Sequence, residues 1–443
     1  MKLTWWVLAL AVLATGANVG AQGASDKTLS PDTRFYVPPP PDAAVQQVFQ
    51  LLKSGNPKDA GLISMMVLTP QGVVLHSDDP KGTLSTIKQT LQLASLEHAV
   101  PVFDLYGIPG ANCSGYGPDT GTVTTAQYEA WIDLIAQTTG NNKAVIILER
   151  GSLANLPSDC GYDPTVVDIP QATADRYAQL NYAINALESK PRILVYLDAG
   201  HSHWKPVGDI AQRLATAGVQ RTQGFFTNGG LYQYTDYETK YDTWVSECIA
   251  FANNPDDGGW RLGHYNYCAS QYWSPYGWVD PNNINTWIYS DWWYLYNMGS
   301  AVPTTHFVID TGHNGQGPFD AGSYAWPPYN QAWWVIQTLN NANWCNPPAR
   351  GVGLRPTANT GVPLLDAYVW MTDPGKSNSV CNSANGLRAW DYSIYTQAGW
   401  PTTTSGQAAF DPLWGMNDPA YDAWFPQEAL DLAQRANPPF SIH

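Results

Sequence analysis

Carboxylate and imidazole side chains stand at the ends of several short apolar runs in this sequence. Glu149, Asp198 and Asp310 each close such a run, and His201 and His313 follow three residues after two of these acids. Two carboxylates placed across a substrate can act as general acid and base, and a cluster of histidines can hold a metal ion. A carboxylate at the end of a strand can also serve as a hydrogen-bond acceptor for a turn, and we expect this simpler role for most of them.

The apolar runs are short and are separated by amphipathic stretches. Buried strands that alternate with helices of about 10–15 residues are typical of a parallel sheet built from βα units. We predict strands at Gly61–Leu68, Val100–Tyr106, Ala144–Glu149, Arg192–Asp198, Gly224–Thr227, His306–Asp310 and Ala367–Met371. We predict helices at Pro41–Ser54, Leu84–Glu97, Thr125–Thr138, Ala172–Ser189 and Val207–Ala217. About seven such units favour a TIM-like α/β barrel, in which residues just past the carboxyl ends of the strands carry the chemistry.

The composition of the 443-residue chain restricts the class of partner. Charged residues make up 13% and aromatic residues another 13%, with 20 Trp, 25 Tyr and 11 Phe. Lys and Arg number 22 against 37 Asp and Glu, which gives a net charge of −15. Nucleic acids and anionic membranes need a basic face, so we expect neither as a partner. We expect a monomer whose partner is neutral and offers flat faces for stacking.

Residues 1–21 are predicted to be a secretory signal peptide. Lys2 precedes an apolar stretch and small residues suited to cleavage. The stretch is shorter than the ~20 residues that cross a bilayer, so we expect a secreted, extracellular protein rather than a membrane-anchored one. A polar, proline-rich leader follows at 22–41, and a single domain is expected over 42–443.

An aromatic-rich insertion is predicted within this domain, at about 232–300. Its aromatic residues are Trp260, Tyr265, Tyr267, Tyr272, Trp273, Tyr276, Trp278, Trp287, Tyr289, Trp292, Trp293, Tyr294 and Tyr296. We expect most of these rings to pack in a local subdomain closed by a Cys248–Cys268 bridge, and a few to face a ligand. Flat rings with polar handles suit sugars, whose C–H faces stack while their hydroxyls form hydrogen bonds.

Six cysteines in an oxidising compartment indicate three disulfides. They are Cys113, Cys160, Cys248, Cys268, Cys345 and Cys381. Sequence alone leaves fifteen pairings open, and we predict pairing in chain order because it closes the shortest loops. A zinc site is the alternative, but the sequence contains no Cys-x-x-Cys pair to support it.

Several segments resemble the motifs of glycoside hydrolase family 6, the cellobiohydrolases and endoglucanases that cut β-1,4-glucan. The matching stretches are Tyr196–Trp204 (the family's YLDAGH…W), Ile309–Thr311 with Asn314–Gly315 (IDTSRNG), Trp344–Asn346 (WCN), Gly353–Gly361 (RPSANTG) and Leu365–Trp370 (LDSFVW). The resemblance covers roughly 35–440. It implies a distorted seven-stranded α/β barrel, with cellulose or other β-1,4-glucan chains as partner. It also implies the bridges Cys113–Cys160 and Cys345–Cys381.

The resemblance places substitutions at the family's catalytic positions. Inverting glycosidases use one carboxylic acid to protonate the leaving oxygen and a second carboxylate, about 6.5–9.5 Å away, to activate water. The position of the acid holds Gly151, that of the aspartate that tunes it holds Asn112, and that of the candidate base holds Asn378. Three further polar positions hold Thr372, Lys376 and His313. Because three carboxylates are lost together, we expect impaired hydrolysis.

The positions that the resemblance implies for sugar binding mostly keep their residues. They are Tyr106, Asp198, His201, Trp204, Asn228, His313 and Trp344, with Trp204 and Trp344 as stacking platforms. A metal site built from His201, His203 and His313 is the alternative for the histidines. We expect no metal and no other cofactor, because the resemblance implies a metal-free role for His201.

Three functions follow as hypotheses. The first, which we predict, is a secreted β-1,4-glucan-recognising protein of this family type with impaired hydrolysis. The second is an active glucanase with relocated acid and base groups. Glu149 lies two residues before Gly151, on the same face if strand alternation continues, and Asp198 and Asp373 are other nearby carboxylates. The third is a secreted decoy or scaffold that binds a protein through the insertion.

Overall fold

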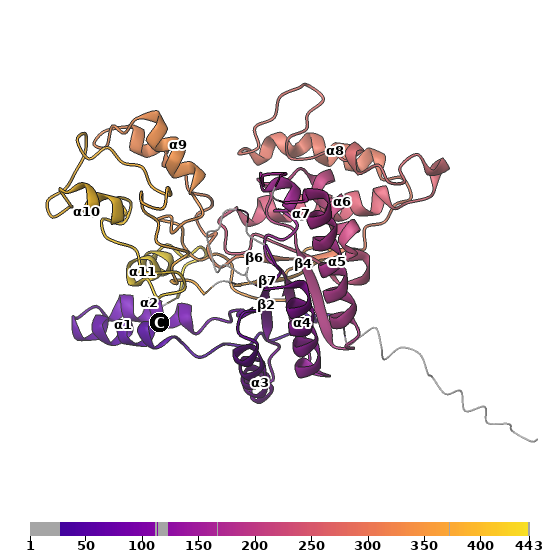
Figure 1. The fold of residues 1–443 in the computed structure, drawn as a ribbon, viewed down its shortest axis with the longest axis horizontal. Coiled ribbons are helices and arrows are strands. Elements are labelled where there is room, and N and C mark those ends of the chain that lie inside the picture. Colours follow the sequence, from indigo (N-terminus) through magenta and orange to yellow (C-terminus); the bar gives the residue numbers. More distant parts are fainter. Residues whose placement is uncertain (1–26, 111–112, 114–122, 166, 372, 442–443) are drawn as a thin grey trace, which may run out of the picture.

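Seven parallel strands form the centre of the molecule (Figure 1). The computed structural model describes residues 27–110, 113, 123–165, 167–371 and 373–441. The strands are β1 (Val73–His76), β2 (Val102–Tyr106), β3 (Ala144–Leu148), β4 (Ile193–Asp198), β5 (Gly224–Thr227), β6 (His306–Asp310) and β7 (Leu365–Val369). Each pairs with its neighbour in the chain, and the sheet curls into a half-barrel. The predicted parallel α/β fold is confirmed.

Helices surround this sheet. They are α1 (Asp42–Lys53), α2 (Pro57–Val67), α3 (Pro80–Leu96), α4 (Thr125–Thr139), α5 (Ile169–Glu188), α6 (Val207–Ala217), α7 (Thr235–Ala252), α8 (Ile288–Asn297), α9 (Trp333–Asn341), α10 (Thr404–Ala409) and α11 (Pro426–Gln434). Helices α3 to α7 contribute apolar side chains to the core outside the sheet. Helices α8 and α9 stand apart from each other at the top of Figure 1.

The strand predicted at Gly61–Leu68 is wrong. Residues 61–67 belong to α2, and the first strand is β1 at Val73–His76. A short apolar run does not reveal its period, whereas Pro57 at the first turn of α2 is a helix-start signal. Ile63 and Met66 pack in a cluster shared with α11, which buries the apolar face of this helix.

Alternation along the strands separates two apolar layers. Phe103 and Leu105 of β2 belong to the layer beneath the outer helices, whereas Val102 belongs to the layer inside the curl. In β4, Leu194 and Tyr196 lie in the same inner layer. Because successive side chains point to opposite faces, the acids that continue these inner rows also lie on the concave side of the sheet.

The segments outside the barrel are fixed by several covalent and apolar contacts. Disulfides join Cys113 to Cys160, Cys248 to Cys268 and Cys345 to Cys381, which confirms pairing in chain order.

Residues 27–41, expected to be a leader, lie partly on the domain, where Phe35 is buried and forms a parallel bridge with Val100. The predicted signal peptide at 1–21 lies outside the described residues. Over the part of the chain that is described, the helices are too short or too polar to cross a bilayer.

Candidate functional site

Three acids lie on the inner face of alternate strands: Asp104 in the middle of β2, and Asp198 and Asp310 at the carboxyl ends of β4 and β6. All are buried, and Asp198 is only 3% exposed. Asp198 Oδ2 accepts from the backbone N–H groups of Gly151 (2.9 Å) and Gly200 (3.1 Å). Asp310 likewise accepts three backbone N–H groups. Asp198 and Asp310 therefore use much of their hydrogen-bonding capacity to hold the turns around them.

Asp104 is compensated differently, by an arginine that sequence reasoning did not single out. Arg150 Nε lies 2.5 Å from Asp104 Oδ2, and the guanidinium carbon lies 5.4 Å from the centre of the Tyr106 ring. Among the described residues, neither carboxylate oxygen of Asp104 has a directed hydrogen bond. Burial raises the pKa of Asp104, and the Arg150 charge acts against that rise. The concave side thus contains a buried ion pair.

Glu149 does not reach the position of Gly151. Strand β3 ends at Leu148, and Glu149 has a φ of +60°, so the alternation expected for a strand stops there. The side chain is fully buried, and Oε2 accepts from the backbone N–H groups of Gly107 and Ile108, both at 2.8 Å. This carboxylate connects the ends of β2 and β3.

Burial shifts the pKa of several of these groups towards the neutral form. It raises the pKa of Glu149 and of Asp198 to about 7 and that of Asp310 to about 6, against the backbone hydrogen bonds that each accepts. Burial also lowers the pKa of His201 to about 3 and that of His313 to about 4. At neutral pH both histidines are therefore neutral.

The free energy of unfolding is expected to fall as the pH rises from about 6.5 to about 8. Unfolded carboxyl groups ionise near pH 4, whereas Glu149 and Asp198 have a folded-state pKa of about 7. At the lower end of this window the folded protein keeps protons on Glu149 and Asp198 that the unfolded chain has lost. The stability that this difference provides is lost as the two groups ionise. Below about pH 6.5 His201 and His313 oppose the trend, because only the unfolded chain protonates them. Urea midpoints across this window measure the slope, and Asp198→Asn should flatten it; a midpoint that rises with pH would contradict the assignment.

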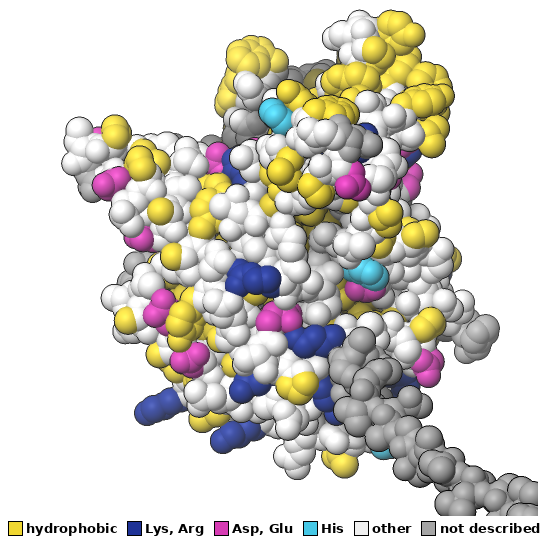
Figure 2. All heavy atoms as spheres, turned by 90° about the vertical axis from the view of Figure 1, so that its right-hand side faces the viewer, with side chains coloured by type: hydrophobic (Ala, Val, Ile, Leu, Met, Phe, Trp, Pro, Cys, Tyr) yellow, Lys and Arg dark blue, Asp and Glu magenta, His cyan; other side chains and the backbone are white. Residues whose placement is uncertain are grey.

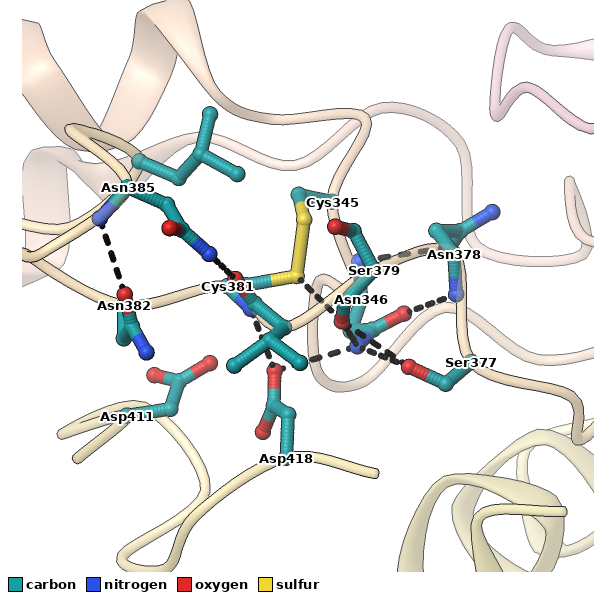
Figure 3. The surroundings of a disulfide bond; sticks show 12 residues. Cys345, Asn346, Ser377, Asn378, Ser379, Cys381, Asn382, Asn385, Asp411 and Asp418 are labelled. Carbon is teal, nitrogen blue, oxygen red and sulfur yellow. Dashed lines mark hydrogen bonds between the residues drawn. A yellow bond between two sulfur atoms is a disulfide. The ribbon is translucent and has the colours of Figure 1, made fainter. Parts of the chain in front are cut away.

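The positions implied for catalysis hold residues without acid or base function. Gly151 has a φ of +73° and donates its backbone N–H to Asp198. Asn378 belongs to a network beside the Cys345–Cys381 disulfide (Figure 3). Its backbone N–H donates to Asn346 Oδ1 (2.7 Å), and its side-chain oxygen accepts from the Asn346 backbone N–H (3.3 Å) and the Tyr232 hydroxyl (3.2 Å). The predicted positions Asn112 and Thr372 lie outside the described residues.

The remaining charged positions near this network form a separate ionic group. Lys376 Nζ lies 2.7 Å from Asp373 Oδ2 and 3.0 Å from Asp422 Oδ1. The two acids raise the pKa of Lys376 against the effect of its burial. Asp373, a candidate for relocated catalysis, is thus paired with a lysine.

A cleft of about 830 Å³ brings the two predicted tryptophan platforms together. Its lining includes His201, His203, Trp204, Gln233, Tyr237, Asn282, Phe319, Asp320, Asn340, Asn343 and Trp344. Trp204 comes from the segment after β4, and Trp344 from the segment after α9. Aromatic rings, amides and one carboxylate are the groups that a neutral polyhydroxylated ligand can use.

Four other predicted binding residues lie outside this lining. Asn228 is buried, and its Nδ2 donates to the carbonyls of Asp310 (2.9 Å) and Gln233 (3.2 Å). His313 is buried with its ring edge to face with Tyr232, and Tyr106 lies against Arg150. Asp198 accepts the backbone bonds given above. In the described part of the chain, no group of three or more His, Cys, Asp or Glu is arranged to hold a metal ion.

Comparison with known proteins identifies the family. The profile of the glycosyl hydrolases family 6 matches residues 30–436. The chain belongs to glycosyl hydrolase family 6. Endoglucanase A of Cellulomonas fimi is 26% identical over 361 residues, which are 81% of this chain and 59% of that protein. A probable 1,4-beta-D-glucan cellobiohydrolase C of Aspergillus terreus is also 26% identical, over 72% of this chain and 60% of its own. The chain thus spans about 60% of the length of these relatives.

Solved structures of family 6 members share the fold. Endoglucanase Cel6 of Mycobacterium tuberculosis, solved with methyl-cellobiosyl-4-deoxy-4-thio-β-D-cellobioside, has a TM-score of 0.58 and 26% identity. The match covers 91% of this chain and 98% of that one. Cellobiohydrolase II of Humicola insolens, in complex with glucose and cellotetraose, has a TM-score of 0.58 at 19% identity. The predicted family and its distorted α/β barrel are confirmed.

Proposed function

We propose that this family 6 member is a secreted protein that binds β-1,4-glucan chains in the Trp204–Trp344 cleft without hydrolysing them by the inverting route. The observation that carries the proposal is the cleft itself, which holds both tryptophans while Gly151 stands at the acid position. An aromatic ring buries the C–H face of a sugar, and amides bond its hydroxyls. The lining of the cleft contains both aromatic rings and amides, so it suits a neutral sugar chain.

The carboxylates near the acid position argue against ordinary catalysis. A general acid must reach the leaving oxygen within hydrogen-bond distance. Asp104, Asp198 and Glu149 are all almost completely buried. Asp198 and Glu149 accept backbone N–H groups, and Asp104 neutralises Arg150. None of the three is among the residues that line the Trp204–Trp344 cleft.

Removal of either platform is expected to weaken binding of cellohexaose. Trp204→Ala and Trp344→Ala should each raise the dissociation constant about tenfold, because each deletes one stacking face. Isothermal titration calorimetry measures the effect. Trp326→Ala is the matched control, since Trp326 is exposed and lies outside the cleft lining. Unchanged affinity in both cleft variants, or no binding by the parent protein, would contradict the proposal.

Residual hydrolysis by Asp198 is the second candidate function. Its pKa of about 7 allows it to hold a proton at neutral pH, and it contacts the backbone of Gly151 directly. The assay is release of reducing ends from cellohexaose by the parent protein and by Asp198→Asn. The binding proposal expects no release from either. Release by the parent that is lost in Asp198→Asn would favour the enzyme instead.

A further inference from the structure

Helix α8 presents an exposed apolar face to solvent. Four apolar residues of α8 are spaced four, three and one positions apart, so they share one side of the helix: Ile288, Trp292, Leu295 and Tyr296. Trp292 is 49% exposed and Tyr296 is 80% exposed. Figure 2 shows hydrophobic side chains gathered at the top of this side of the molecule. A contiguous apolar patch of this kind marks a binding surface more often than a scattered exposed residue does.

The loop before α8 extends this face. Tyr276 is 78% exposed and lies 5.3 Å from Tyr289, whose ring is 5.6 Å from that of Trp292, all measured between centroids. Trp278, on the same loop, is 69% exposed. We call Tyr276, Trp278, Tyr289, Trp292, Leu295 and Tyr296 the α8 face.

The opposite side of α8 is anchored firmly. Tyr294 is buried, and its hydroxyl donates to the carbonyl of Ala269 at 2.9 Å. Asp291 accepts from Lys240 and from the Trp244 indole N–H on α7. Within the insertion, the Cys248–Cys268 disulfide connects α7 to the loop before α8. The exposed rings are therefore held on a rigid support, which lowers the entropy lost on binding.

The charge of the segment restricts its partner. Residues 262–300 contain no Lys or Arg, and their only acidic residues are Asp280 and Asp291. Asp291 is already paired with Lys240. An anionic membrane or a nucleic acid would need basic residues here. The most exposed rings belong to Tyr and Trp, which combine an apolar ring with a hydroxyl or an indole N–H. These groups suit a partner that is apolar on its face and hydroxylated at its edge.

The same insertion also reaches the cleft. Asn282 lines the cleft, and its carbonyl accepts the Tyr237 hydroxyl at 2.7 Å. Ring contacts continue from Tyr237 to Trp287 (5.0 Å between centroids), then to Trp244 (5.4 Å) and Tyr294 (6.2 Å). One continuous aromatic framework therefore connects a wall of the cleft to the helix that carries the exposed face.

We propose that the α8 face is a second carbohydrate site, which docks the protein on the flat face of insoluble β-1,4-glucan. The choice of polysaccharide rests on the proposed function of the cleft. The α8 face would bind chains side by side on a particle, whereas the cleft takes a single chain. Adsorption to a solid and affinity for a soluble oligosaccharide are therefore separable properties.

The test compares adsorption of the protein to microcrystalline cellulose with its affinity for soluble cellohexaose. The double variant Trp292→Ala/Tyr296→Ala should adsorb about tenfold more weakly, because two stacking rings are lost, and should bind cellohexaose unchanged. Trp326→Ala/Trp333→Ala is the matched control, since both residues are exposed and lie outside the insertion. It should adsorb like the parent protein.

Two results would overturn the proposal. One is adsorption that does not change in the Trp292→Ala/Tyr296→Ala variant. The other is a parent dimer, seen by sedimentation, that this variant converts to a monomer, because the α8 face would then join two copies of the chain. Failure of the cleft proposal has a different signature, since the parent protein would then fail to bind soluble cellohexaose at all.

Discussion

Gly151→Asp combined with Asn378→Asp is expected to give the protein measurable hydrolysis of cellohexaose. A Cβ at Gly151 would meet only Asn155 Nδ2, at 3.7 Å, and aspartate tolerates positive φ better than most residues. Asn378→Asp keeps the oxygen that accepts from Tyr232 and Asn346. Each positioned acid or base contributes about 10²–10⁴ in rate, so the double variant should exceed the parent protein by at least roughly 10².

The single variants are the controls for this gain. Inversion needs both an acid and a base, so Gly151→Asp or Asn378→Asp alone should give much less than the pair. The adjacent Arg150 charge would hold the pKa of the new acid low, so activity should increase as the pH falls below neutral. Release of reducing ends at several pH values measures both effects. A double variant as inactive as the parent protein, with its cellohexaose affinity intact, would show that more than these two carboxylates is missing.

Arg150→Ala is expected to lower the free energy of unfolding by about 3–5 kcal/mol at neutral pH. The substitution leaves Asp104 fully buried without the cation that lies 2.5 Å from it. Protonation of Asp104 relieves an unpaired buried charge, so the loss should be smaller at about pH 5 than at about pH 8. Urea unfolding at both pH values gives the two numbers.

Two further variants distinguish the effect of losing this ion pair from the general effect of replacing an arginine. Arg435→Ala breaks the exposed Arg435–Asp431 pair and should cost less than about 1 kcal/mol. Adding Asp104→Asn to Arg150→Ala removes the uncompensated charge and should recover part of the lost stability. A loss for Arg150→Ala that is no larger than that for Arg435→Ala would mean that the pair does not stabilise the fold.

The sheet was predictable because its strands are short apolar runs that end in turn residues. Strand β4 and helix α6 agree with their predicted ranges closely, since a fully buried parallel strand and an amphipathic helix each leave a clear pattern. Helix α2 was missed because a short apolar run does not reveal its period. The site was harder to predict, since Arg150 and Asp104 are 46 residues apart and meet only when β2 and β3 pair.

The aromatic residues show the same limit of local patterns. Trp287 and Tyr294 are buried, whereas Trp292 and Tyr296 are exposed, although all four stand in one aromatic segment. The composition predicts a neutral partner with flat faces, but it does not predict which aromatic rings contact that partner. Glu149 is another case, because β3 ends before it and its carboxylate binds the backbone of Gly107 and Ile108, which strand alternation does not predict.

The order of the sheet also has a consequence for biosynthesis. Every strand from β2 to β7 pairs with the strand made immediately before it, so an edge is ready for each strand as it leaves the ribosome. Pairings between strands that are neighbours in the chain close shorter loops than pairings between distant strands, so they carry a lower entropy cost of loop closure. Trp204 is made with the middle of the sheet, whereas Trp344 and Asn378 flank β7. A nascent chain therefore has both walls of its cleft only after Trp344 has been made, and it completes the sheet shortly afterwards with β7, before α10 and α11 are added.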